Sequence, residues 1–240
     1  MVAASSPKGL PMPPATLLTD IAVTIDTDAL LPRLHLKPQS PEAREFRALA
    51  IEAQRVARPK AAFLIGYINA RDNESVVIAG TRFASRVLSV NLSAVHRVFA
   101  YVATCGTELN EWAASLTDVL QQFWAEELKV TALRTATTQV FAAISHENPG
   151  QMASMNPGSL ADWPLTEQRP FFHLLGDLPQ QLGVTLSDSC IMTPNKSVTG
   201  FRFGNDSGYV NCRLCPREDC PGRAAPYEPE LYAQRYESAD

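Results

Sequence analysis

The chain has 240 residues, of which 45% are hydrophobic and 19% are charged, and its formal net charge is −4. This length and composition are typical of a folded protein with a substantial core, and no long basic run indicates a nucleic-acid surface. The longest apolar stretches run about eight residues, far short of the roughly 20 that a membrane-spanning helix needs.

The N-terminal 18 residues, 1–18, are rich in Pro, Ser and small side chains and lack the apolar segment of a signal peptide. We therefore predict a flexible arm here, a single domain over residues 19–240, and a cytoplasmic location. The first strong helix signal begins at Ser40, which is a good N-cap residue. Pro41 suits the first helical turn, and Pro59 ends the pattern.

Three runs of β-branched and apolar residues follow, and each predicts a strand: 61–68, 75–80 and 96–105. Two helices are predicted next, over residues 106–116 and 117–145. The second has a broad apolar face and no Gly or Pro in its interior. Its length indicates a central helix that packs on a sheet.

An irregular segment, residues 147–164, contains Asn-Pro-Gly at 148–150 and again at 156–158. Both are turn signals, because Pro fixes φ and Gly accepts a positive φ. A long irregular segment in a compact domain is often functional. A helix is predicted after it, from near Thr166 to Gly176.

The remaining residues, 184–214, predict strands joined by turns at 193–196 and 204–208. A Cys-rich segment, 212–223, lies near the C-terminus. Because strands and helices are partly segregated along the chain, the pattern favours an α+β fold with a mostly antiparallel sheet over a doubly wound parallel one. No G-x-G-x-x-G or P-loop pattern occurs, so classical nucleotide sites are unsupported.

The Cys-rich segment carries the most specific chemical signal, the spacing Cys212-x2-Cys215-x4-Cys220. Three thiolates at this spacing can turn toward one ion, whereas zinc and cubane iron–sulfur clusters usually take four ligands. The fourth ligand could be Cys190, Cys105, a histidine or an exogenous group. We predict a metal site with Cys190 as the fourth ligand; a reversible dithiol and three free thiols are the alternatives.

Two polar segments are further candidates for a binding site. Asp162 and Trp163 lie at a loop-to-helix junction, where an acid complements the helix dipole and a Trp either plugs the core or stacks on a planar ligand. Lys196 and Ser197 lie in the segment 193–200, which offers a cation, hydroxyl groups and a Gly that lets backbone approach a ligand. An ordinary β-turn is the alternative there.

The residues of these two segments carry a family resemblance. LSDSCIMTPNKSVTGFRF (186–203) resembles the activation-domain segment of vitamin B12-dependent methionine synthase, with its Met-x-Pro-x-x-Ser-Val-Ser-Gly motif and aromatic strand. NPGSLADWPLTEQRPFFHLLG (156–176) resembles it too; in the family a Pro-Gly loop supports S-adenosylmethionine, and a helix follows. The chain is most similar to small stand-alone proteins with Asp-Trp-Pro-Leu, Lys-Ser-Val-Ser-Gly and a trailing cysteine cluster. The likeness covers most of residues 40–228.

The resemblance implies a curved, mostly antiparallel sheet flanked by helices. It also implies the reactivation of an oxidised corrinoid, through one electron and the methyl group of S-adenosylmethionine. The cobalamin would lie on a partner, a corrinoid-binding protein or a cobalamin-dependent methyltransferase, and a reductase or flavodoxin-like protein would donate the electron. The site residues it implies are Gly158, Asp162, Trp163, Lys196 and Ser197.

The chain departs from the synthase pattern Arg-x-x-Pro-Gly-Tyr, whose Arg and Tyr contact the methyl donor in that family. Ser154 stands at the Arg position and Ser159 at the Tyr position, so no guanidinium is available there to pair with the donor's carboxylate. Arg169 and Lys196 are candidates to replace it.

Two further functions are compatible with the same residues. One is a non-enzymatic module that binds a corrinoid protein and uses zinc to fix its C-terminal loop. The other is a subunit of a cobalamin-dependent methyltransferase. An iron–sulfur centre rather than zinc at the cysteines would indicate electron transfer.

Overall fold

A sheet of seven antiparallel strands organises the molecule, in the order β4-β3-β2-β5-β9-β6, with β1 also paired to β2. The computed structural model describes residues 15–205, 207–217, 219–220 and 222–237. The strands are β1 (Ala15–Leu18), β2 (Lys60–Arg71), β3 (Ser75–Ile78), β4 (Thr81–Ala84), β5 (Arg97–Thr104), β6 (Met152–Met155) and β9 (Ser197–Gly204). A separate two-stranded pair is formed by β7 (Thr185–Leu186) and β8 (Met192–Thr193). The predicted α+β class with an antiparallel sheet is confirmed.

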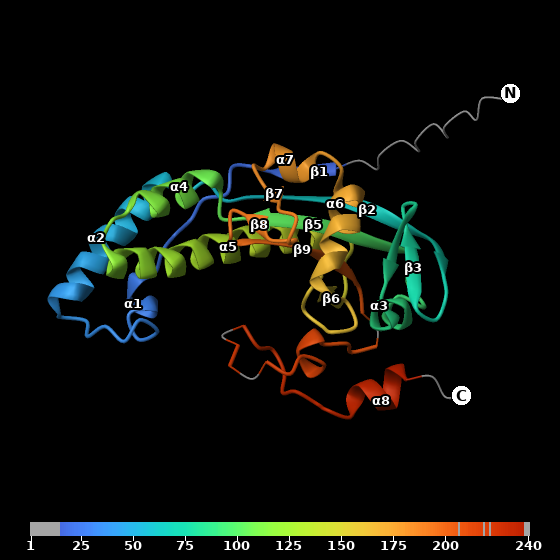
Figure 1. Cartoon of the computed structure of the whole chain (residues 1–240). Coiled ribbons are helices and arrows are strands. Elements are labelled where there is room, and N and C mark those ends of the chain that lie inside the picture. Colours follow the sequence, from blue (N-terminus) through green and yellow to red (C-terminus); the bar gives the residue numbers. More distant parts are fainter. Residues whose placement is uncertain (1–14, 206, 218, 221, 238–240) are drawn as a thin grey trace, which may run out of the picture.

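Helices gather at both ends of this sheet and on both of its faces (Figure 1). They are α1 (Thr27–Leu30), α2 (Pro41–Val56), α3 (Arg86–Asn91), α4 (Thr107–Ser115), α5 (Val119–Glu147), α6 (Gln168–Leu175), α7 (Leu178–Gln181) and α8 (Leu231–Tyr236). Two 3-10 turns, η1 (Leu165–Glu167) and η2 (Asn211–Arg213), complete the list. No helix in the described part of the chain is long and apolar enough to cross a membrane.

The long helix α5 is the central helix that its sequence predicts. Asp118 caps its start, because its Oδ1 accepts hydrogen bonds from the backbone N–H groups of Leu120 and Gln121, at 2.8 and 2.9 Å. Its buried residues recur every fourth position, as a helix face against a core requires: Leu128, Ala132, Ala136, Val140 and Ile144. The C-terminal half of α5 covers the aromatic side chains of β2 and β5 on one face of the sheet.

The opposite face of the sheet packs on α6 and the loop that precedes it. Four aromatic residues form the centre of this core, with ring centroids 4.7 to 6.4 Å apart: Phe83, Trp163, Phe171 and Phe201. Rings in these tilted and stacked arrangements bury a large apolar area. This core fixes the loop 156–163 against the sheet.

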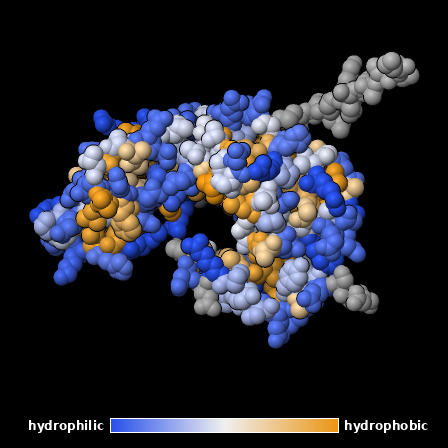
Figure 2. Space-filling model, in the orientation of Figure 1, coloured by the Kyte–Doolittle hydropathy of each residue, from blue (hydrophilic) through white to orange (hydrophobic). Residues whose placement is uncertain are grey.

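The C-terminal segment, residues 207–237 as far as they are described, crosses below the sheet and ends in α8 beside α3 (Figure 1). The space-filling view shows the molecule hollowed between this segment, the sheet and α5 (Figure 2). We call this concavity the central hollow. It lies beside the strand β6, which is the edge strand of the sheet.

Two parts of the fold differ from the sequence-based predictions. Residues 15–18, expected in the flexible arm, form β1 and pair with residues 61–64 of β2, because the first half of β2 has a free edge that backbone hydrogen bonds can fill. The rest of the predicted arm, residues 1–14, lies outside the described residues. The strand predicted to continue to residue 214 is instead the 3-10 turn η2, because Gly208 at φ 66° turns the chain away from β9.

Candidate functional site

The loop between β6 and α6 is a tight turn built on Asn156, Pro157 and Gly158. The N–H of Gly158 donates to the carbonyl of Trp163 at 2.8 Å, and the N–H of Ser159 donates to the carbonyl of Asn156 at 3.0 Å. Gly158 has φ 84°, and a Cβ there would lie 3.0 Å from the Cδ1 atom of the neighbouring Leu side chain at position 165. Gly158 is therefore required by the shape of this turn.

The side chain of Asn156 fastens this turn to the sheet. Its Nδ2 donates to the hydroxyl of Tyr101 on β5 and to the carbonyl of Thr199 on β9, both at 2.7 Å. The hydroxyl of Thr199 in turn donates to Gln168 Oε1 of α6 at 2.6 Å. Burial raises the pKa of Tyr101 to about 12, against the opposing effect of the hydrogen bond from Asn156, so the phenol stays protonated.

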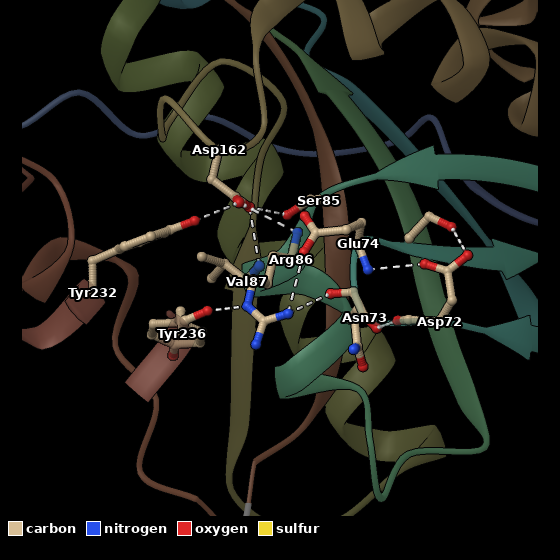
Figure 3. Close-up of polar contacts among 11 residues, drawn as sticks. Asp72, Asn73, Glu74, Ser85, Arg86, Val87, Asp162, Tyr232 and Tyr236 are labelled. Carbon is tan, nitrogen blue, oxygen red and sulfur yellow. Dashed lines mark hydrogen bonds and ion pairs between the residues drawn. The ribbon is translucent and has the colours of Figure 1, made fainter. Parts of the chain in front are cut away.

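Asp162 holds two distant parts of the chain together (Figure 3). Its carboxylate accepts hydrogen bonds from the hydroxyl of Ser85 and from the N–H groups of Arg86 and Val87, at 3.3 and 3.0 Å for the two N–H donors. It also accepts from the hydroxyl of Tyr232 on α8 at 3.2 Å. The carboxylate thus caps α3 and anchors the C-terminal segment, and its role as a ligand to a cofactor stays a prediction.

A second anchor lies beside Asp162 and uses Arg86 and Tyr236 (Figure 3). The Arg86 guanidinium donates to the backbone carbonyls of Tyr236 and Asn73 and to a carboxylate oxygen of Glu74. The Tyr236 ring is fully buried, and its hydroxyl exchanges hydrogen bonds with Asn91 on α3. The C-terminal segment is therefore held firmly at its far end.

Trp163 lies in the core rather than on a cleft. Its side chain is 0% exposed and stacks on Phe201 with 5.7 Å between ring centroids and an interplanar angle of 7°. Its indole Nε1 has no hydrogen-bond partner among the described residues. The prediction placed Trp163 in the lining of a cleft; the structure places it beneath the surface, because the aromatic core encloses both faces of the ring.

Lys196 and Ser197 lie near α5, held by different elements from those that hold Asp162. Lys196 Nζ forms an ion pair with Glu126 of α5 at 3.0 Å. The Ser197 hydroxyl donates to Thr104 Oγ1 at 2.9 Å and is within 2.8 Å of the Pro194 carbonyl. These contacts are all with other residues of the protein. Contact of Lys196 and Ser197 with a cofactor stays a prediction.

Lys129 is the buried centre of the cluster around Lys196. Its Nζ contacts Glu126 at 2.5 Å, Asn195 Oδ1 at 2.8 Å and Asn110 Oδ1 at 3.2 Å, which accounts for its three donors. A cavity of about 460 Å³ opens beside this cluster, between α4 and α5. The polar network ties α5 to the turn between β8 and β9.

Glu126 is expected to make folding sensitive to acid. Burial alone would raise its pKa, but hydrogen bonds from Lys129, Lys196 and Asn195 outweigh burial and lower the pKa from 4.5 to about 2. A carboxyl with a lowered pKa stabilises the folded state above its unfolded pKa, and this contribution is lost as pH falls from about 4.5 to about 2. In Glu126→Gln, the free energy of unfolding should be lower at neutral pH and should fall less over this range.

The measurement is urea unfolding of both proteins at several pH values from neutral to about 2. Glu111→Gln is the matched control, because Glu111 is exposed on the neighbouring helix α4. A Glu126→Gln profile parallel to that of the original protein would contradict the prediction.

The four predicted metal ligands do not converge in the described residues. Cys212, Cys215 and Cys220 are half-buried in the C-terminal segment, and Cys190 is buried. No group of three or more His, Cys, Asp or Glu side chains lies close enough to hold a metal within the described ranges. The residues as placed do not fit zinc or an iron–sulfur cluster, so we derive no electron-transfer step through one, and the metal site stays a prediction.

Arg223 organises the cysteine loop through backbone contacts. Its guanidinium donates to the carbonyls of Cys212 and Cys215, at 3.0 and 2.9 Å, and also to those of Arg217 and Ala225. The Cys212 sulfur accepts a hydrogen bond from a backbone N–H at 3.4 Å. Arginine, rather than disulfide bonds, thus shapes this loop, since every cysteine of the chain is free.

Cys105 is one of the alternatives to Cys190 as the fourth metal ligand, and it is enclosed in the core. It is 0% exposed and packs with residues of α2, α4 and α5. Burial raises the pKa of its thiol to about 11, so it stays protonated. This matches the behaviour of a cysteine that serves as a small apolar side chain.

A guanidinium lies opposite position 154, on the neighbouring strand of the sheet. Arg202 on β9 faces Ser154 across the β6–β9 pairing, and its Nη1 donates to the Ser154 hydroxyl at 3.2 Å. The two candidates named from the sequence are engaged elsewhere: Arg169 donates to the carbonyl of Asp188, and Lys196 pairs with an acid of α5. The sequence analysis missed Arg202, whose one signal was a charge inside the apolar run Gly-Phe-Arg-Phe.

Comparisons with known proteins give one informative result. No family model and no curated protein matches the chain, whereas 13 chains of solved structures do. Among them is the crystal structure of the MetH reactivation domain bound to AdoHcy, with a TM-score of 0.65 and 16% sequence identity, covering 86% of this chain and 83% of that one. At this identity the likeness concerns the fold, and the protein therefore has the fold of the MetH reactivation domain.

Proposed function

We propose that this protein is an accessory factor that reactivates a corrinoid-dependent methyltransferase. The observation that supports the proposal is the fold of the MetH reactivation domain over 86% of the chain. On this proposal the protein docks on a cobalamin-binding partner, and the methyl group of S-adenosylmethionine together with one electron returns the corrinoid to its methylated state. A reductase or flavodoxin-like protein supplies the electron.

The construction of the central hollow supports the same proposal. The edge strand β6 lies on one side of it, and the C-terminal segment lies on the other (Figures 1 and 2). The hydrogen bonds of Asn156 and Asp162 hold these two sides in fixed positions. A rigid concave surface is what positioning a methyl donor requires.

The C-terminal cysteines form a separate, finer part of the proposal. Cys212, Cys215 and Cys220 would bind zinc or an iron–sulfur centre only after the thiols move together, because they do not form a metal-binding group as described. Arg223 contacts all three backbones that would have to move, through its guanidinium at Cys212 and Cys215 and through its N–H at Cys220. Iron, zinc and sulfide analysis of protein purified without oxygen tests this part directly.

The main test is a reactivation assay. The cobalamin-binding module of methionine synthase, loaded with oxidised cob(II)alamin, is mixed with S-adenosylmethionine and titanium(III) citrate as the one-electron reductant. We expect this protein to increase the rate at which methylcobalamin appears in the absorbance spectrum, and to have no effect when S-adenosylmethionine is omitted. Stable binding to the module without any rate increase would contradict reactivation and favour the non-enzymatic binding module.

A further inference from the structure

Arg202 is a cation on the strand next to the edge of the sheet. It lies on β9, opposite Phe99 of β5 and opposite Ser154 of β6. Its guanidinium carbon is 4.1 Å from the centroid of the Phe141 ring on α5, a distance typical of a cation–π contact. The ring and the Ser154 hydroxyl together fix the guanidinium in one position.

The charge of Arg202 has no counter-ion in the described part of the chain. It takes part in no ion pair there, in contrast to Arg33, Arg47 and Arg213, each of which pairs with a carboxylate at 2.5 to 2.8 Å. Its Nε is buried and has no hydrogen-bond partner. Burial lowers the pKa of Arg202, although the neighbouring Tyr101 opposes this effect. A partly buried guanidinium without a counter-ion costs free energy, and a bound anion would offset that cost.

The surroundings of Arg202 favour a carboxylate as that anion. The fork of N–H donors on a guanidinium matches the two oxygens of a carboxylate. Ser154, the residue opposite, has a small side chain, and both residues are only partly buried. Ser154 belongs to β6, the edge strand beside the central hollow. Arg202 belongs to β9, the next strand of the sheet, so a ligand in the hollow would lie one strand away from it.

We propose that Arg202 is the carboxylate-binding residue of this protein and that it binds the amino-acid end of S-adenosylmethionine and AdoHcy. This inference rests on the proposed function for the identity of the ligand. The guanidinium is supplied by β9 rather than by β6, and Ser154 orients it by accepting one of its hydrogen bonds.

The test is calorimetric titration with AdoHcy and with 5′-methylthioadenosine, which has the same nucleoside but no carboxylate. Arg202→Met should weaken AdoHcy binding by about 10- to 100-fold, the range of one charge-assisted hydrogen-bonded pair. It should leave binding of 5′-methylthioadenosine unchanged, and Arg202→Lys should retain part of the affinity for AdoHcy. The melting temperature of Arg202→Met should stay the same or rise, because a methionine removes an uncompensated charge from a partly buried place.

Arg97→Met is the matched control. Arg97 also lies over a phenylalanine ring, with 5.6 Å from its guanidinium carbon to the Phe99 centroid, but it already has Asn148 Oδ1 as a partner at 3.0 Å. Its replacement should leave both affinities unchanged. Equal AdoHcy affinity in Arg202→Met and the original protein, or an equal loss for both ligands, would overturn the inference while the proposed function stands. Absence of AdoHcy binding by the original protein, with the cobalamin module present, would overturn both.

Discussion

Gly200→Ala is expected to lower the free energy of unfolding by about 3 kcal/mol, the sum of an overpacked site and a disturbed buried hydrogen bond. A Cβ at this position would lie 2.3 Å from Asn156 Nδ2, 2.6 Å from the Met155 carbonyl and 2.9 Å from the Tyr101 hydroxyl. Two of these neighbours cannot move without breaking the bond between Asn156 and Tyr101. The change should therefore also loosen the turn that carries Gly158.

Urea unfolding measures the loss, and Gly204→Ala is its control. Gly204 lies on the same strand, β9, and a Cβ there would meet nothing within 4 Å. That variant should be within about 0.5 kcal/mol of the original protein. If both alanine variants unfold at the same urea concentration, the close approach of Asn156 to the strand is not important for stability.

Asp162→Ala should destabilise the protein by about 2 to 3 kcal/mol and release the C-terminal segment. The substitution removes the acceptor for the hydroxyl of Ser85 and for the first N–H groups of α3, those of Arg86 and Val87, although Ser85 still caps the helix. It also removes the acceptor for Tyr232 of α8. Limited proteolysis should then cut within residues 207–237 before the sheet unfolds, because that segment loses one of its two anchors.

Asp177→Ala is the matched control for this experiment. Asp177 stands at the N-cap position of α7 but makes no side-chain cap hydrogen bond. Its removal should change neither stability nor the cleavage pattern. A cleavage pattern of Asp162→Ala identical to that of the original protein would show that Arg86 and Tyr236 hold the C-terminal segment without help from Asp162.

Local chemistry was sufficient to predict the elements with strong periodicity and clear ends. The helix α2 begins at Pro41 because Ser40 caps it, with its Oγ accepting from Ala43 N at 3.2 Å. The long helix α5 follows from an apolar face that no Gly or Pro interrupts. The helix α6 ends at Gly176, whose φ of 59° suits a helix C-terminus.

Elements that depend on distant partners escaped prediction. β1 forms only because the edge of β2 is available, 49 positions further on at the pair Ala15–Leu64 and 43 at the pair Leu18–Ala61. Residues Ser187–Ile191 were predicted to belong to a strand. They form instead the loop that connects the two short paired strands β7 and β8. Such pairings have long sequence separations and weak local signals.

The sequence identified some residues of the candidate site, but it did not predict which contacts their side chains make. Asp162 was expected near a helix N-terminus, yet the helix it caps is α3, some 76 residues earlier in the chain. The charge of Arg202 inside an apolar run was not enough to predict its position, because that position depends on the register that places it opposite Ser154. Burial decided the position of Trp163, and no local pattern distinguishes a core tryptophan from one on a surface.

The buried Tyr236 has a consequence for synthesis of the protein on the ribosome. Its ring belongs to the same apolar core as residues of β3, α3 and β9, and its hydroxyl bonds to Asn91. Since domains generally complete folding as units, the nascent chain keeps part of this core open to solvent until residue 236 has left the exit tunnel. Chaperone contact with nascent chains should therefore persist until residue 236 has emerged.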